Sequence, residues 1–91
     1  MRKEFRAIVH GKVQMVMYRD FACRKAHGLG LAGTVKNLPD KTVEVVAQGE
    51  EKDLEAYLKK LNRGSLFARV EGVEVAWREP SYAFEGFKIV Y

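Results

Sequence analysis

Arg19 and Asn37 are the side chains of this sequence best suited to chemistry on an anion. Residues 11–19 lead from a predicted strand through a short turn into a predicted helix that begins near Met17. No Ser, Thr, Asp or Asn stands just before that helix, so its first N–H groups lack a side-chain partner. Those groups and the helix dipole favour a bound anion, and the planar guanidinium of Arg19 suits phosphate oxygens. The stretch is equally compatible with an ordinary strand-to-helix loop that carries a surface arginine.

Other catalytic chemistries lack the residues that they need. A thiol phosphatase loop places an Arg six residues after its Cys, whereas Leu29 stands six residues after Cys23. Cys23 falls within the predicted helix, where a packing role is expected. Ser65 and Ser81 have no His nearby in the sequence, and no Cys, His or carboxylate cluster has the spacing of a metal site. We therefore expect no metal site.

Asn37 stands at the end of the second predicted strand, where it could face the anion-binding turn. An amide side chain donates and accepts hydrogen bonds, so it can orient a water molecule, but it cannot act as a general base. This pairing suits a substrate with a good leaving group that water attacks directly, and acyl phosphates are such substrates because the leaving carboxylate needs no proton. A plain turn role beside Pro39 and Asp40 is the alternative for Asn37.

Hydrophobic periodicity predicts the elements that must position these residues. Apolar residues alternate in the strands and recur at helical spacing in the helices. The predicted elements are strand 4–13, helix 18–29, strand 31–36, strand 42–48, helix 50–63, strand 70–78, a break at 79–81 and a short last strand that holds Phe87, Ile89 and Tyr91. The order β-α-β-β-α-β plus a terminal strand predicts an α+β, two-layer ferredoxin-like (split βαβ) sandwich, with an antiparallel sheet and both helices on one face.

The composition is that of one globular domain. The chain has 91 residues, 47% of them hydrophobic and 31% charged, so we expect a single domain over residues 1–91. One cysteine and no secretory signal favour a reducing, cytoplasmic location. No apolar run approaches the roughly 18 residues of a membrane span. The net charge of +4 is spread along the chain, which gives little support to nucleic-acid binding.

Residues 9–19 resemble the first signature of the acylphosphatases, G-x-V-Q-G-V-x-[FY]-R. Residues 28–40 resemble the G-x-x-G-x-V-x-N region of the same family, and the likeness continues through residues 43–49 and 84–89. The resemblance implies a ferredoxin-like sandwich and a hydrolase of small acyl phosphates that needs neither metal nor cofactor. It also implies a cytoplasmic monomer whose partners are its substrate and inorganic phosphate, with no nucleic acid and no membrane.

The resemblance also implies roles for particular residues. Arg19 matches the arginine that binds the phosphoryl group, and Asn37 matches the asparagine that positions the attacking water. The phosphate-binding loop is formed by the backbone N–H groups of Gln14, Met15, Val16, Met17 and Tyr18.

Three positions depart from the family pattern. Met15 stands where Gly is usual, so a positive φ there would cost on the order of 1 kcal/mol and could reshape the loop. Thr34 replaces a common tryptophan, which is expected to alter packing near Asn37. Lys41 replaces a hairpin glycine, which suggests a different turn type. Asp20 is expected to point away from a bound phosphate.

Two other functions share this fold. A non-catalytic phosphate-binding or regulatory module is the alternative, motivated by Met15. An RNA-binding domain has the same strand order and stacks bases on aromatic residues of its central strands. Residues 42–48 contain no aromatic residue, which disfavours the RNA-binding reading.

Overall fold

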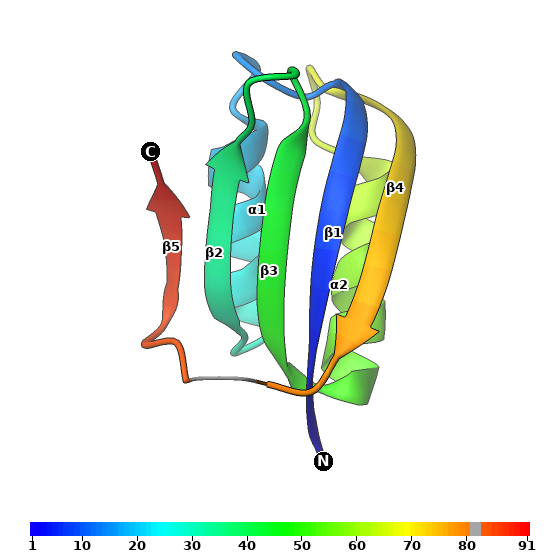
Figure 1. Cartoon of the computed structure of the whole chain (residues 1–91). Coiled ribbons are helices and arrows are strands. Elements are labelled where there is room, and N and C mark those ends of the chain that lie inside the picture. Colours follow the sequence, from blue (N-terminus) through cyan, green and yellow to red (C-terminus); the bar gives the residue numbers. More distant parts are fainter. Residues whose placement is uncertain (81–82) are drawn as a thin grey trace.

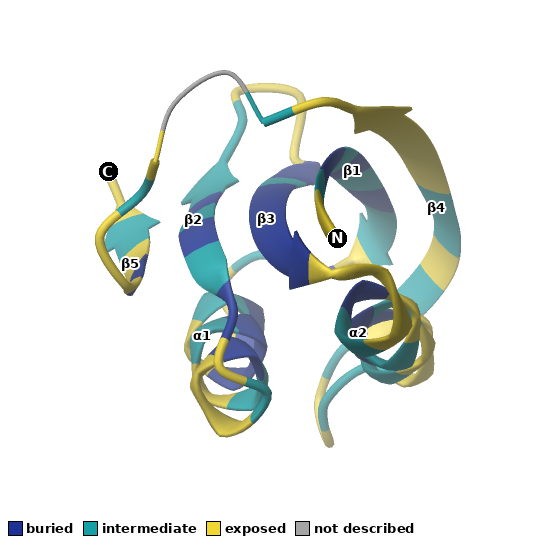
Figure 2. Cartoon of the chain, turned by 90° about the horizontal axis from the view of Figure 1, so that it is seen from below, coloured by how far each residue is buried: buried dark blue, intermediate teal, exposed yellow. Residues whose placement is uncertain are grey.

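The computed structural model describes residues 1–80 and 83–91 and contains one five-stranded sheet with two helices on one of its faces (Figures 1 and 2). Ser81, which the sequence places in the break after Pro80, lies outside the described residues. The elements are β1 (Arg2–Lys12), α1 (Tyr18–Gly28), β2 (Ala32–Asn37), β3 (Val43–Glu50), α2 (Glu51–Arg63), β4 (Arg69–Arg78) and β5 (Phe87–Val90). No helix among the described residues is long and apolar enough to cross a membrane.

The strand order is β4-β1-β3-β2-β5, with β1 and β3 at the centre. β1 pairs antiparallel with β3 and with β4, and β2 pairs antiparallel with β3. β5 is the exception, since it pairs parallel to β2, with Gly33 opposite Phe87. The predicted antiparallel sheet is therefore correct for four strands and wrong for the last one. Because β2 and β5 run in the same direction, their C-terminal ends lie at the same end of the sheet as the C-terminal end of β1 and the start of α1 (Figure 1).

Alternation along the central strands places one side of the sheet against the helices. Phe5, Ala7 and Val9 of β1 are fully buried, as the sequence predicts. α2 contributes a stripe at helical spacing, of which Leu54, Tyr57 and Leu61 are fully buried. Its acidic first turn and basic last turn suit the helix dipole.

A buried carboxylate ties β1 to its neighbours on the opposite side of the sheet. Glu4 is 1% exposed, and it accepts a hydrogen bond of 2.7 Å from Nε2 of Gln48 and a short one from Nε of Arg78. The backbone N–H of Phe84 in turn donates to Oε1 of Gln48 at 3.4 Å. A buried charge is tolerated only when it is paired and hydrogen-bonded, and this network supplies both conditions for Glu4.

Two buried tyrosines connect the two helices through hydrogen bonds. The hydroxyl of Tyr18, at the start of α1, donates to the carbonyl of Leu61 at 2.7 Å. The hydroxyl of Tyr57 donates to the carbonyl of Ala22, also at 2.7 Å. Burial raises the pKa of both phenols above the ordinary value, so both stay protonated as donors. Since Leu61 lies in the last turn of α2, its carbonyl has no partner within the helix, and Tyr18 supplies one.

Tyr18→Phe is expected to lower the free energy of unfolding by about 1–3 kcal/mol, because it leaves the carbonyl of Leu61 buried without a donor. Urea titration followed by circular dichroism measures the change. Tyr91→Phe is the matched control, since the Tyr91 side chain is 93% exposed, and its midpoint should stay at the wild-type value. Equal midpoints for Tyr18→Phe and the wild type would contradict this role of the hydroxyl.

Candidate active site

A β-bulge that requires glycine lies at the end of β1, just before the loop that leads to α1. The register between β1 and β4 shifts between His10 and Gly11, and Gly11 adopts φ 124°. A Cβ at this position would overlap the carbonyl oxygen of Arg69 on β4. A bulge bends its strand, so this one directs residues 13–17 over the end of the sheet.

The backbone of the loop turns twice through the left-handed region. Met15 has φ 61° and Met17 has φ 62°, while Val16 between them packs against the core. Met17 is the N-cap residue of α1, and no side chain caps that helix. The sequence predicted the uncapped start and raised the possibility of a positive φ at Met15, but it missed the second one at Met17. A sharply turned segment that leads into an uncapped helix presents N–H groups to an anion.

Met15 has the positive φ that was considered for this position from the sequence. Met15 takes the left-handed conformation in which glycine is at ease, and its side chain is 99% exposed. Lys41 behaves in the same way at φ 76°, so its backbone occupies the region that a hairpin glycine favours. The cost at both positions is backbone strain.

Arg19 follows directly after this loop and has no acidic partner. Among residues 1–80 and 83–91, no carboxylate lies within salt-bridge distance of it. Its guanidinium lies over the ring of Tyr91, 4.9 Å from the ring centroid. Asp20, the nearest acid in sequence, accepts a hydrogen bond from Nε of Arg24 at 2.9 Å, although it also lines the groove described below. The positive charge of Arg19 is therefore available to a ligand.

A groove of about 560 Å³ opens beside Arg19. Its lining comes from the loop, the first turn of α1 and the end of β5: Met15, Met17, Tyr18, Arg19, Asp20, Ile89 and Tyr91. Asn37, Gln14 and Val16 lie outside this lining. The contribution of Tyr91 was missed in the sequence, because nothing there indicates that β5 runs parallel to β2.

Asn37 is the last residue of β2, and its Oδ1 is buried without a hydrogen-bond partner in the protein. In a plain turn role, this oxygen would be expected to accept a bond from a nearby backbone N–H. Buried polar atoms are nearly always paired, so an unpaired one calls for an explanation such as an unseen water or a functional role. Asn37 therefore has an acceptor free to bind a water molecule.

Gln14 connects the loop to the turn that follows Asn37. Its side-chain amide donates to the carbonyl of Leu38 and to that of Thr42, each at 2.8 Å. These bonds join the loop before α1 to the connection between β2 and β3, which is distant in sequence. Sequence reasoning assigned Gln14 only a backbone role, so this side-chain role is new.

The turn itself is closed by hydrogen bonds centred on Thr42. The carbonyl of Thr42 also accepts from the N–H of Leu38 at 2.9 Å. The N–H and hydroxyl of Thr42 both donate to Oδ1 of Asp40, at 3.1 and 2.5 Å. These two hydrogen bonds lower the pKa of the Asp40 carboxyl below its ordinary value. These hydrogen bonds help to stabilise the turn between β2 and β3.

Cys23 lacks the features of a nucleophile, as the sequence indicates. Burial, and to a smaller extent the charge of Asp20, raise the pKa of its thiol. A raised pKa keeps the thiol protonated and unreactive. Its nearest polar partner is the carbonyl of Phe87 at 3.5 Å.

An α+β sandwich with an uncapped helix start, and with an arginine that has no acidic partner among the described residues, has the features of a protein that binds a phosphate-like anion. The acylphosphatase family model matches residues 5–89. An acylphosphatase of Thermus thermophilus is 51% identical over 91% of this chain and 93% of its own length, and one of Thermococcus kodakarensis is 45% identical over 90% and 89%. The crystal structure of acylphosphatase from Bacillus subtilis superposes with a TM-score of 0.95 at 36% identity, covering 98% of this chain and 99% of that one.

The chain belongs to the acylphosphatase family. The ferredoxin-like fold predicted from the sequence is confirmed, and so is the assignment as a hydrolase of acyl phosphates.

Met15→Gly is expected to raise the free energy of unfolding by up to about 1 kcal/mol, because glycine adopts a positive φ without strain. Met15→Ala is the matched control: it removes the same thioether but keeps a Cβ in the left-handed conformation, so it should give no gain. Urea titration of both variants measures the difference. If the alanine variant gains as much as the glycine variant, backbone strain at this position is not the cause.

Gln14→Met is expected to lower kcat at least about tenfold, since the side chain keeps its length but loses both donors that fix the turn after Asn37. Each of the two carbonyls retains a backbone donor, so the loss of stability should stay within about 1 kcal/mol. Binding of inorganic phosphate should change less than kcat, because the loop N–H groups remain. Steady-state hydrolysis and phosphate titration separate the two effects, and an unchanged kcat would contradict the positioning role.

Proposed function

We propose that the groove beside Arg19 binds the phosphoryl group of a small acyl phosphate and that Asn37 directs water at its phosphorus. The observation that carries this proposal is the combination of an unpaired guanidinium and an uncapped helix start with the Gln14 link to the turn after Asn37. Among the described residues, the guanidinium has no acidic partner, the helix start has no side-chain cap and Oδ1 of Asn37 has no hydrogen-bond partner, while the Gln14 link holds the turn after Asn37. Together they supply a cationic group, backbone donors and a water acceptor.

The phosphoryl oxygens are bound by two kinds of donor. The guanidinium of Arg19 forms charge-assisted hydrogen bonds with two of them. The N–H groups of Gln14, Met15, Val16, Met17 and Tyr18 surround the rest. Because these donors are fixed before the substrate arrives, they stabilise the charge of the transition state without reorganisation.

Asn37 orients the attacking water through its side-chain oxygen. Oδ1 accepts one hydrogen bond from the water, which leaves a lone pair of the water directed at phosphorus. The oxygen of water bonds to phosphorus as the bond to the carboxyl oxygen breaks, and the products are a carboxylate and inorganic phosphate. The leaving carboxylate is stable as an anion, so no general acid is needed.

The chain is also proposed to act as a cytoplasmic monomer. The support is the lone Cys23, which suits a reducing compartment. No nucleic acid or membrane takes part in the proposed reaction.

Arg19→Ala and Asn37→Ala are each expected to lower kcat/KM for an aryl acyl phosphate by about 10²–10³-fold or more, through lost charge stabilisation and lost water orientation. Arg19→Lys should recover little, since an ammonium cannot form the planar pair of bonds. Arg2→Ala and Asn62→Ala are the matched controls, being exposed residues of the same types, and should keep wild-type rates. Continuous measurement of hydrolysis gives the rates.

Two outcomes would contradict the assignment of roles. Wild-type rates in both the Arg19 and Asn37 variants would place the chemistry elsewhere. Phosphate binding without any wild-type turnover would favour the non-catalytic module instead.

A further inference from the structure

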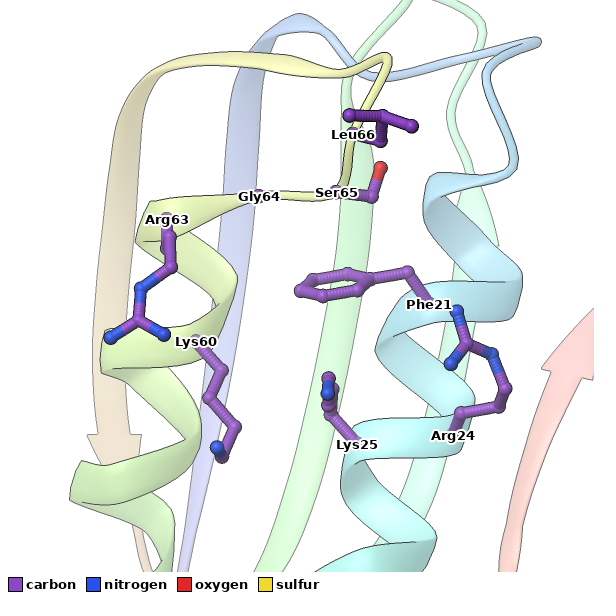
Figure 3. Close-up of a pocket in the computed structure, with 8 residues that line it drawn as sticks. All are labelled: Phe21, Arg24, Lys25, Lys60, Arg63, Gly64, Ser65 and Leu66. Carbon is purple, nitrogen blue, oxygen red and sulfur yellow. The ribbon is translucent and has the colours of Figure 1, made fainter.

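A second pocket lies between the two helices, on the side of the molecule away from the sheet (Figure 3). Its volume is about 310 Å³. The residues that matter for its chemistry are Phe21, Arg24 and Lys25 from α1, Lys60 and Arg63 from the last turn of α2, and Ser65 from the following loop. None of these residues lines the groove beside Arg19, so the two sites are separate.

Four cations and no carboxylate line this pocket. Figure 3 shows Lys25 and Lys60 extending from the two helices into the space between them, below the ring of Phe21. Among the described residues, neither of these lysines nor Arg63 has an acid within salt-bridge distance, whereas Arg24 pairs with Asp20. Like charges gathered around one hollow repel each other, so the pocket favours an anion.

Ser65 lines the pocket but does not face the two lysines. Its Oγ is buried and has no hydrogen-bond partner in the protein. A hydroxyl can rotate to donate or to accept, and a buried one nearly always has a partner. Figure 3 shows this hydroxyl pointing away from Lys25 and Lys60, so it is not a donor to an anion held between those lysines.

We propose that this pocket is a binding site for a small anion with several negative charges, of the oligophosphate or polycarboxylate class. The cations are spread over two helices, so a single phosphate can contact only some of them, whereas an anion with several charges can contact more. The ring of Phe21 closes the pocket with an apolar wall, and the cation of Lys25 lies 5.9 Å from the centre of this ring. The proposal is independent of the roles of Arg19 and Asn37.

Isothermal titration with inorganic tripolyphosphate and, separately, with citrate tests the proposal at low ionic strength. All proteins carry Arg19→Ala, which removes the charge of the other site, and circular dichroism checks that they fold. Lys60→Glu reverses a charge in the pocket, and Lys59→Glu, at an exposed position outside its lining, makes the same change in net charge. Ser65→Ala removes the unpaired hydroxyl.

We expect one bound anion per chain in the Arg19→Ala background. Lys60→Glu should raise the Kd at least about tenfold, whereas Lys59→Glu and Ser65→Ala should each raise it less than about threefold. The ratio of the two affinities tells oligophosphate from polycarboxylate. The proposal is overturned if neither anion binds in this background, or if Lys59→Glu weakens binding as much as Lys60→Glu, since that result would mean attraction by net charge alone.

Discussion

The two hydrogen bonds donated by the side chain of Gln14 hold together the parts of the molecule on which the proposed chemistry depends. Arg19 lies on the helix α1, and Asn37 lies at the end of the strand β2. Gln14 joins the loop that precedes Arg19 to the carbonyls of Leu38 and Thr42, just beyond Asn37. A mismatch of about 1 Å between reacting groups can cost a factor of a hundred in rate, so such a link matters more for turnover than for stability.

Much of this arrangement can be predicted from the sequence because it depends on local patterns. Alternation in β1 identifies the buried side of the strand, and helical spacing identifies the stripe of Leu54, Tyr57 and Leu61. The missing cap before Tyr18 is also a local signal, and it pointed to the anion-binding end of α1. The family signatures then indicated Arg19 and Asn37, whose roles remain a proposal.

The features that the sequence did not reveal depend on long-range pairing. Burial of Glu4 makes sense only once Gln48 and Arg78 are known to flank it, and both lie on other strands. The parallel direction of β5 places Tyr91 over Arg19, and a four-residue strand carries no sign of its direction. The hydrogen bonds of the Gln14 side chain likewise require that two loops lie side by side, and hydrophobic periodicity cannot indicate such a contact. The second positive φ, at Met17, is missed because methionine has no preference for it.

The two methionines of the loop have a consequence for how the protein responds to oxidants. Met15 is 99% exposed and Met17 is 72% exposed, so peroxides in solvent reach both sulfur atoms. Conversion to the sulfoxide would replace an apolar, flexible side chain by a polar and chiral one on the rim of the groove. The backbone turn would stay, since it does not depend on the thioether. Oxidative damage at these positions would therefore change the surface that an acyl group meets and spare the donors that surround the phosphoryl oxygens.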